Sequence, residues 1–373
     1  MSNDDNLRKS RSRRLVALDA ARGLAVIGMF VQHFALNNFN ASIVSGNTMI
    51  LFILCSGISF SLMSQRMLEK GTEMASFRAQ MLARAVFIDL VGYLLIMLNA
   101  PFAVILPAYA ALFVLALVLV HCSRRTLFII SAALLIVGPP LMILGGSVFS
   151  SAYFLSDIAG GPLSALGVAP VFVAGMALGR LNLHSVRNAI WFTVSGTFVL
   201  VITKILAAKV LPVWLQSFEQ WLIANTNVTA AQPDPYAIWP HNVMPPLWNM
   251  LLTSAPQSGS SFQLLIGLGT SLIVLGLACL IEKKLAAVLL PFAAVGQVAL
   301  TLYAAQFVLA WVLITAGVNY YIGEIPFGDG IVVLITLLAG WLLVRFSQAP
   351  LETLMRRFDR LFSGFEKNNA SPT

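Results

Sequence analysis

Residues 15–37 read LVALDAARGLAVIGMFVQHFALN, a run that is long and apolar enough to cross a membrane as one helix. About 20 helical residues span the hydrocarbon core of a bilayer. Five basic residues precede this run: Arg8, Lys9, Arg11, Arg13 and Arg14. Positive charge stays on the cytoplasmic side during insertion, so we expect this helix to begin inside the cell.

The rest of the chain repeats this pattern. Of its 373 residues, 58% are hydrophobic and only 10% are charged, whereas a soluble domain carries roughly 25% charged residues. We therefore expect an all-α integral membrane protein, a polytopic bundle of about ten transmembrane helices. The ten runs are residues 15–37, 47–65, 84–100, 102–121, 126–146, 162–180, 189–212, 260–281, 292–318 and 330–346.

The basic residues test this arrangement. Twenty of the 23 Lys and Arg residues fall in segments that it places in the cytoplasm, and the other three lie inside predicted spans. This alternation predicts that both termini are cytoplasmic. It gives a basic tail at 1–14, a single transmembrane bundle at 15–346 with a long outer loop at about 213–258, and a cytoplasmic tail at 347–373. The net charge of +8 is explained by insertion and needs no nucleic-acid partner.

Polar residues within the first run form a seam. At about 100° per residue, Asp19, Arg22, His33 and Asn37 share a stripe about 60° wide on one helix face. Arg22 and His33 are about 16 Å apart along the axis, so they lie near opposite ends of the helix. Ionisable groups inside a membrane are costly and usually functional. The seam predicts a site, although Asp19 and Arg22 could be a packing pair and His33 an interfacial histidine.

Four stretches resemble one family of membrane acyltransferases. RLVALDAARG (14–23) is similar to the R-L-x-x-L-D-x-x-R-G opening of the heparan-alpha-glucosaminide N-acetyltransferase family, and LFILCSGIS (51–59) resembles its L-F-x-x-x-x-G-x-S stretch. VGQVALTLY (295–303) and APLETLMR (349–356) resemble G-x-x-A-L-T-x-Y and the tail G-P-L-E-x-x-x-R of the bacterial branch. The four occur in order, so the bacterial branch is a good match.

The resemblance implies an acyltransferase of the cell membrane of a bacterium. It would move acetyl, or another short acyl group, from cytoplasmic acyl-CoA to a sugar or envelope glycolipid on the outer side. Acyl-CoA is then the donor substrate, no metal is expected, and a homo-oligomer stays open. Family members use a histidine on the far side of the membrane, and related sequences carry His where Gln257 stands and, in some cases, where Gln306 stands. If those histidines carry the chemistry, this chain would depend on His33 or be altered in activity.

The candidate site follows from both arguments. His33 is the predicted base, because imidazole titrates near neutral pH, with Asp19 and Arg22 as its partners in catalysis. Thr301, Tyr303 or Gln306 could donate hydrogen bonds to a developing oxyanion. The predicted substrate-binding residues are Asn37, Gln257, Ser258, Thr301, Tyr303 and Gln306.

Two other classes stay open. A transporter or flippase would use Asp19, Arg22 and His33 to line a substrate or proton path, although the sequence has no internal repeat that would favour one. A non-catalytic scaffold for envelope assembly is the third reading. The chain has no phosphate-binding loop, HExxH, GxSxG or dinucleotide motif. Its three cysteines, at unrelated spacings, predict buried thiols.

Overall fold

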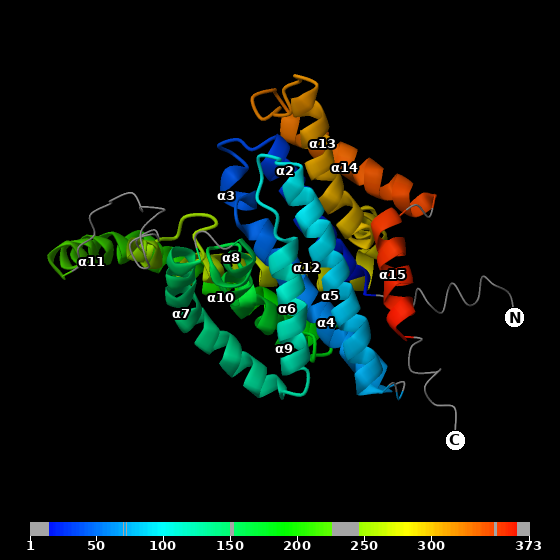
Figure 1. The fold of residues 1–373 in the computed structure, drawn as a ribbon, viewed down its shortest axis with the longest axis horizontal. Helices are drawn as coiled ribbons and strands as arrows, with labels where there is room; N and C mark the ends of the chain where they lie inside the picture. The colour runs from blue at the N-terminus through cyan, green and yellow to red at the C-terminus, as the bar shows by residue number, and fades with distance from the viewer. Residues whose placement is uncertain are drawn as a thin grey trace, which may run out of the picture.

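The computed structural model describes residues 15–69, 71, 73–149, 153–225, 246–346 and 349–363, and all regular structure in these ranges is helical. Figure 1 shows the helices gathered into one bundle, from which α11 extends to one side. The protein is an all-helical polytopic membrane bundle, as the sequence predicts. The predicted tail at 1–14 lies outside the described residues.

The helices follow the apolar runs closely. All ten predicted runs overlap a helix, and their bounds differ by several residues at most of the ends. The elements are α2 (Val16–Phe34), α3 (Ala41–Val44), α4 (Asn47–Glu69), α5 (Met74–Met97), α6 (Leu106–Leu119), α7 (Arg124–Val148), α8 (Tyr153–Ala159), α9 (Ala165–Leu178), α10 (Val186–Lys209), α11 (Leu211–Asn225), η1 (Trp248–Leu252), α12 (Ser261–Gln297), α13 (Ala299–Thr315), α14 (Gly328–Arg345) and α15 (Pro350–Ser363).

Length and composition qualify six helical segments of the described chain as membrane spans: α3 with α4, α5, α7, α10, α12 and α14. Three shorter apolar helices, α6, α9 and α13, accompany them. The 19 residues of α2 include Asp19, Arg22 and His33 of the polar seam, which lower its hydropathy. The fourth predicted member, Asn37, lies beyond Phe34, where the helix ends. The number of crossings and the orientation of the chain stay predictions from charge.

The predicted turn at Lys283 and Lys284 corresponds to a kink at Leu285, whose φ of −137° and ψ of 45° are not helical, so α12 consists of two helical segments that meet there. The start of the next span is predicted wrongly: helix resumes directly after the kink and runs to Gln297, and the ninth predicted span, 292–318, is broken at Val298 between α12 and α13. Hydropathy could not place the start of the second segment, because residues 285–295 are all apolar.

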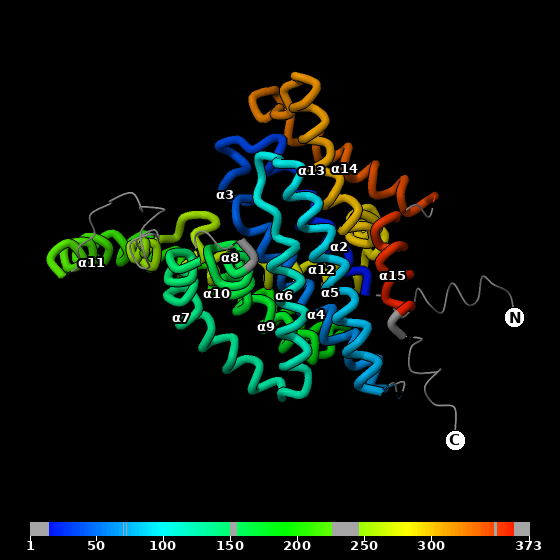
Figure 2. Tube along the Cα trace, viewed as in Figure 1, coloured from blue at the N-terminus to red at the C-terminus, as the bar shows by residue number. Residues whose placement is uncertain are grey.

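Two predicted loop regions contain helices. The start of the outer loop forms α11, and residues 248–252 form η1, whereas 226–245 lie outside the described residues. The predicted C-terminal tail contains α15, which packs beside α5, far from it in sequence (Figure 2). Arg84 of α5 bonds Asp359 of α15, with its Nε 3.1 Å from Oδ2.

Glycines bring the central helices into backbone contact. A Cβ added to Gly296 of α12 would lie 1.9 Å from the carbonyl oxygen of Asp19, and one added to Gly23 of α2 would lie 1.9 Å from that of Phe292. A Cβ added to Gly57 of α4 would lie 2.1 Å from the carbonyl oxygen of Phe172, and one added to Gly175 of α9 would lie 2.4 Å from that of Leu54. These small residues therefore let α2 pack on α12 and α4 on α9, the close approach that membrane helices use.

Candidate functional site

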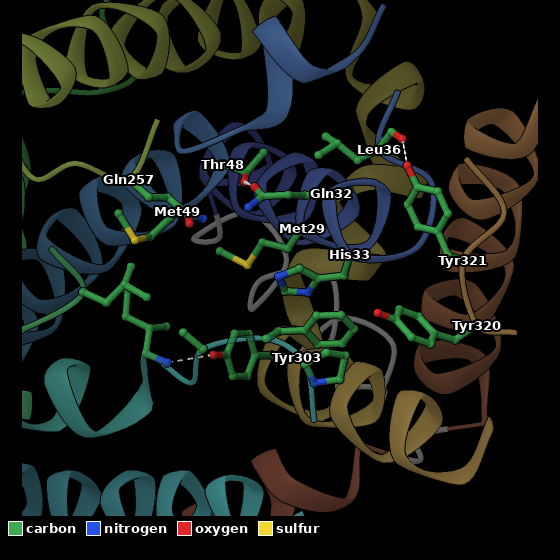
Figure 3. Close-up of a pocket in the computed structure, with 15 residues that line it drawn as sticks. Met29, Gln32, His33, Leu36, Thr48, Met49, Gln257, Tyr303, Tyr320 and Tyr321 are labelled. Carbon is green, nitrogen blue, oxygen red and sulfur yellow. Dashed lines mark hydrogen bonds between the residues drawn. The ribbon is translucent and has the colours of Figure 1, made fainter. Parts of the chain in front are cut away.

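A cavity of about 350 Å³ opens beside His33, and we call it the outer cavity from the predicted orientation. Figure 3 shows that His33 comes from α2, Thr48 and Met49 from α4, and Tyr303 from α13, around one space. The segment after α13 closes one side: the amide of Ile322 donates to the carbonyl of Phe34 at 2.7 Å, and Tyr321 donates its hydroxyl to that of Leu36. This strap positions Tyr320 and Tyr321 along the cavity.

His33 is held in one orientation. Its Nδ1 lies 3.0 Å from Oε1 of Gln306, and its ring stacks on Phe102 with centroids 4.1 Å apart and planes 3° from parallel. With the Gln306 amide in this orientation its oxygen faces Nδ1, and because an amide oxygen only accepts hydrogen bonds, Nδ1 carries the hydrogen in this pairing. The neutral ring then has its lone pair on Nε2. That is the tautomer a general base requires at Nε2.

Gln306 is fully buried in α13, with 0% of its surface exposed. Its Nε2 has no hydrogen-bond partner among the described residues, and burial without a partner is costly for an amide. Such exceptions in a native structure call for a reason. Here the amide stands directly behind the histidine and determines which ring nitrogen is basic.

The predicted inner pair is present. Arg22 Nη1 lies 3.1 Å from Asp19 Oδ1, and the same guanidinium bonds the carbonyl of Gly296 at 3.4 Å and the hydroxyl of Ser59. The prediction that Asp19 and Arg22 face the interior within salt-bridge reach is confirmed. Both line a second, inner cavity of about 340 Å³, together with Arg66.

A middle cavity of about 220 Å³ lies between the inner and outer ones. It shares Arg22, Ser59 and Met63 with the inner cavity and Tyr303 with the outer cavity. The three therefore abut in series, from the Arg22 end of α2 to its His33 end. Tyr303 forms the division between the last two, where its hydroxyl accepts a 2.9 Å hydrogen bond from the amide of Ile105.

The predicted substrate-binding residues divide into two groups. Gln257 and Tyr303 line the outer cavity, and Gln306 supports His33 from behind. Of the two positions at which the family resemblance implies histidine, Gln257 thus lines the cavity that His33 also lines, and Gln306 bonds the His33 ring. Gln257 has a left-handed φ of 57°, so its backbone follows an uncommon path there.

The other three residues hold local structure. Asn37 Oδ1 accepts from the amides of Phe39 and Asn40 at 3.0 Å each, which forms the turn after α2. Ser258 is buried and bonds the hydroxyl of Ser260 at 3.2 Å, next to the start of α12. Thr301 contacts Glu352 of α15 rather than a cavity near His33.

The sequence did not single out several residues of the outer cavity. Phe102, which stacks on His33, follows the predicted hairpin between two spans, and no local pattern marks it. Tyr320 and Tyr321 are adjacent aromatic residues in a predicted outer loop, and this pair is the sequence signal that could have indicated a cavity wall there. Glu352 lies in the APLETLMR stretch, but its partner Thr301 in α13 is 51 residues away in the sequence, so no local pattern pairs the two.

Comparison with known families gives one match. The model of a family described as "Protein of unknown function (DUF418)" matches residues 236–361, about a third of the chain. The matched stretch contains Gln257, Tyr303 and Gln306 but not α2. Searches of curated proteins and of solved structures found no match.

Proposed function

We propose that this protein is a membrane-bound acyltransferase that moves an acetyl or another short acyl group from cytoplasmic acyl-CoA to an extracytoplasmic sugar or envelope glycolipid. The observation that supports it is His33, whose Nδ1 bonds Gln306 so that Nε2 is free to act as a base beside a cavity. The resemblance of four sequence stretches to membrane acetyltransferases points to the same reaction.

The chemistry needs a base and a proton carrier. In the proposed step, an acceptor hydroxyl or amine transfers its proton to Nε2 of His33 while its oxygen or nitrogen attacks the thioester carbonyl carbon. The carbon–sulfur bond then breaks, and the imidazolium returns the proton to the CoA thiolate. Donors near the cavity, such as the Tyr303 hydroxyl, would stabilise the oxyanion.

The donor has to reach His33 from the other side. Arg22 and Arg66 line the inner cavity, and two cationic side chains there suit the phosphates of CoA. The middle cavity lies between this end and the outer cavity, about 16 Å farther along α2. A pantetheine arm that occupied the three cavities in series would bring its thioester towards His33.

The transporter alternative has one observation in its favour: the same three cavities in series could conduct a substrate or a proton. The two functions differ in one respect that can be measured. An acyltransferase breaks the thioester of acyl-CoA and releases a free thiol, whereas a transporter leaves the bond intact.

The test uses the full chain in lipid nanodiscs with radiolabelled acetyl-CoA, extracted envelope glycolipids and a panel of free sugars. We expect labelled acceptor and stoichiometric thiol release. His33→Ala should lower transfer by about 10²–10⁴-fold. His184→Ala, at an exposed turn, is the matched control and should retain activity.

Two outcomes would contradict the proposal. Transfer at nearly the normal rate by His33→Ala would show that the imidazole is structural. Failure of the wild-type protein to bind acetyl-CoA, in a nanodisc preparation with an intact thermal transition, would move the transporter function ahead.

A further inference from the structure

A second cavity on the outer side, of about 470 Å³, lies between α3, α10 and the start of α12. It has no lining residue in common with the outer cavity around His33. The two are nevertheless neighbours, because Asn47 and Pro256 line this cavity whereas the next residues, Thr48 and Gln257, line the other. We call it the Lys204 cavity, after the lysine in its wall.

Gln263 in α12 provides the first sign of a ligand here. Only 4% of its surface is exposed, and its Oε1 has no hydrogen-bond partner among the described residues. The side chain is fixed against Gly46, because a Cβ added to that glycine would lie 3.1 Å from Nε2 of Gln263. Gln263 lines the cavity, so a molecule bound there that reached this side chain would supply the donor that Oε1 lacks among the described residues.

Lys204 provides the charge. Among the described residues that line this cavity, it is the one with an ionisable side chain, so the cavity is cationic. A lysine within an apolar helix is expensive unless its ammonium reaches a polar partner. Together, Lys204 and Gln263 suit a ligand that carries an anionic group and, next to it, a hydroxyl that can donate a hydrogen bond.

The depth of Lys204 favours a lipid. It lies five residues before Lys209, where α10 ends, which is about 7.5 Å along the helix axis. Its neighbours Val201 and Ile205 are 47% and 52% exposed, as expected of residues that face hydrocarbon chains. A cation about one and a half turns below the helix end, beside an apolar face, is at the level of lipid phosphates and glycerol groups.

We infer that the Lys204 cavity binds the polyol-phosphate head group of an anionic glycerophospholipid. The lipid phosphate pairs with the Lys204 ammonium, a head-group hydroxyl donates to Oε1 of Gln263, and the acyl chains lie along the exposed side of α10. A soluble polyol phosphate has the same chemistry without the chains, so the experiment includes both sources. Binding at this cavity does not depend on acyl transfer at His33.

The test is native mass spectrometry of the full-length protein in detergent, titrated with dioleoyl phosphatidylglycerol or dioleoyl phosphatidylcholine. We expect tighter binding of phosphatidylglycerol to the wild-type chain. Lys204→Ala should weaken it about fivefold, the usual effect of one basic residue near a membrane surface. Gln263→Met, which keeps the side-chain length and removes the acceptor, should weaken it as well.

Lys209→Ala removes the same charge from the end of the same helix and is the matched control, since Lys209 does not line the cavity. The inference is supported if Lys204→Ala and Gln263→Met lose phosphatidylglycerol preference and Lys209→Ala keeps it. It is overturned if the three variants behave alike, if phosphatidylcholine binds equally well, or if soluble glycerol phosphate displaces the lipid at equal concentration. The last result would identify a soluble ligand.

Discussion

The Nδ1 of His33 and the Oε1 of Gln306 are 3.0 Å apart, although 273 positions separate the two residues in the sequence. The contact joins α2 to α13 and fixes the hydrogen on Nδ1. It therefore connects the packing of two helices to the protonation pattern of the proposed base. The fold, rather than the local sequence around His33, therefore leaves Nε2 as the basic nitrogen of the ring.

Gln306→Leu should separate catalysis from stability. Leucine removes the acceptor for Nδ1, so the ring can adopt the other tautomer, and it also removes a buried amide nitrogen without a partner among the described residues. We expect kcat for acyl transfer to fall about 10–100-fold, with little change in KM or in the thermal transition. Gln306→Glu retains an acceptor and should keep more activity. Full activity in Gln306→Leu would exclude a role for the tautomer.

Helical periodicity was enough to predict the polar seam on α2, because Asp19, Arg22 and His33 belong to one continuous helix. The neighbours of His33 could not be predicted in the same way. Phe102 reaches it from a loop between two spans, and Gln306 was marked only by a family resemblance, not by any pattern near it. The charged residues Lys283 and Lys284 marked the kink at Leu285, whereas nothing in the apolar run around Val298 marked the break between α12 and α13. Contacts between distant segments follow from packing, which hydropathy does not encode.

The Arg22 and Asp19 pair allows the structural and binding roles to be distinguished. Arg22→Ala should lower thermal stability, since the guanidinium joins Asp19, Ser59 and Gly296 across three helices. A double-mutant cycle with Asp19→Asn should give a coupling of about 0.5–3 kcal/mol. If Arg22 also binds CoA, the KM for acetyl-CoA should rise in Arg22→Ala under conditions where the protein is folded. If the stability losses of Arg22→Ala and Asp19→Asn are simply additive, the two side chains do not act as a pair.

Gly296→Ala should disrupt the contact between α2 and α12. The added methyl group would lie 1.9 Å from the carbonyl oxygen of Asp19, so the backbones must separate. Overpacking of this kind costs about 1–3 kcal/mol, measurable as a lower thermal transition in detergent. Gly330→Ala is the control, since nothing lies within 4 Å of its added Cβ, and it should be neutral or stabilising by up to ~1 kcal/mol. Equal changes in the thermal transition for Gly296→Ala and Gly330→Ala would show that the close contact between α2 and α12 does not limit stability.

The orientation of the chain can be checked with reporter fusions. The positive-inside pattern predicts cytoplasmic signals for fusions after Arg125, Arg187 and Lys284, and outside signals for fusions between residues 225 and 250. Lys284 is the informative site, because α12 continues through this position with only a kink. If the fusion after Lys284 reports the outside while the fusion after Arg187 reports the cytoplasm, the segment at 260–281 does not cross the membrane as predicted, and the ten-span arrangement is wrong.

Glu352 should connect the C-terminal helix to the site. Its Oε1 accepts from the amides of Leu300 at 2.8 Å and Thr301 at 3.1 Å, and its Oε2 accepts from the Thr301 hydroxyl. The carboxylate thereby satisfies the free N–H groups in the first turn of α13 and opposes the positive end of its dipole. Glu352→Ala leaves these part-buried donors without a partner from α15.

We expect Glu352→Ala to lower stability by about 2 kcal/mol, the upper range for loss of a helix cap. It should also expose the segment before α15 to limited proteolysis. Glu352→Gln keeps an acceptor oxygen and should be intermediate, and Glu324→Ala, at an exposed loop position, should behave as wild type. Tyr303 and Gln306 lie on the same helix, within two turns of the capped end. We therefore expect the rate of acyl transfer to fall along with the thermal stability in Glu352→Ala. Protease resistance equal to wild type in Glu352→Ala would show that α15 is held by its apolar contacts alone.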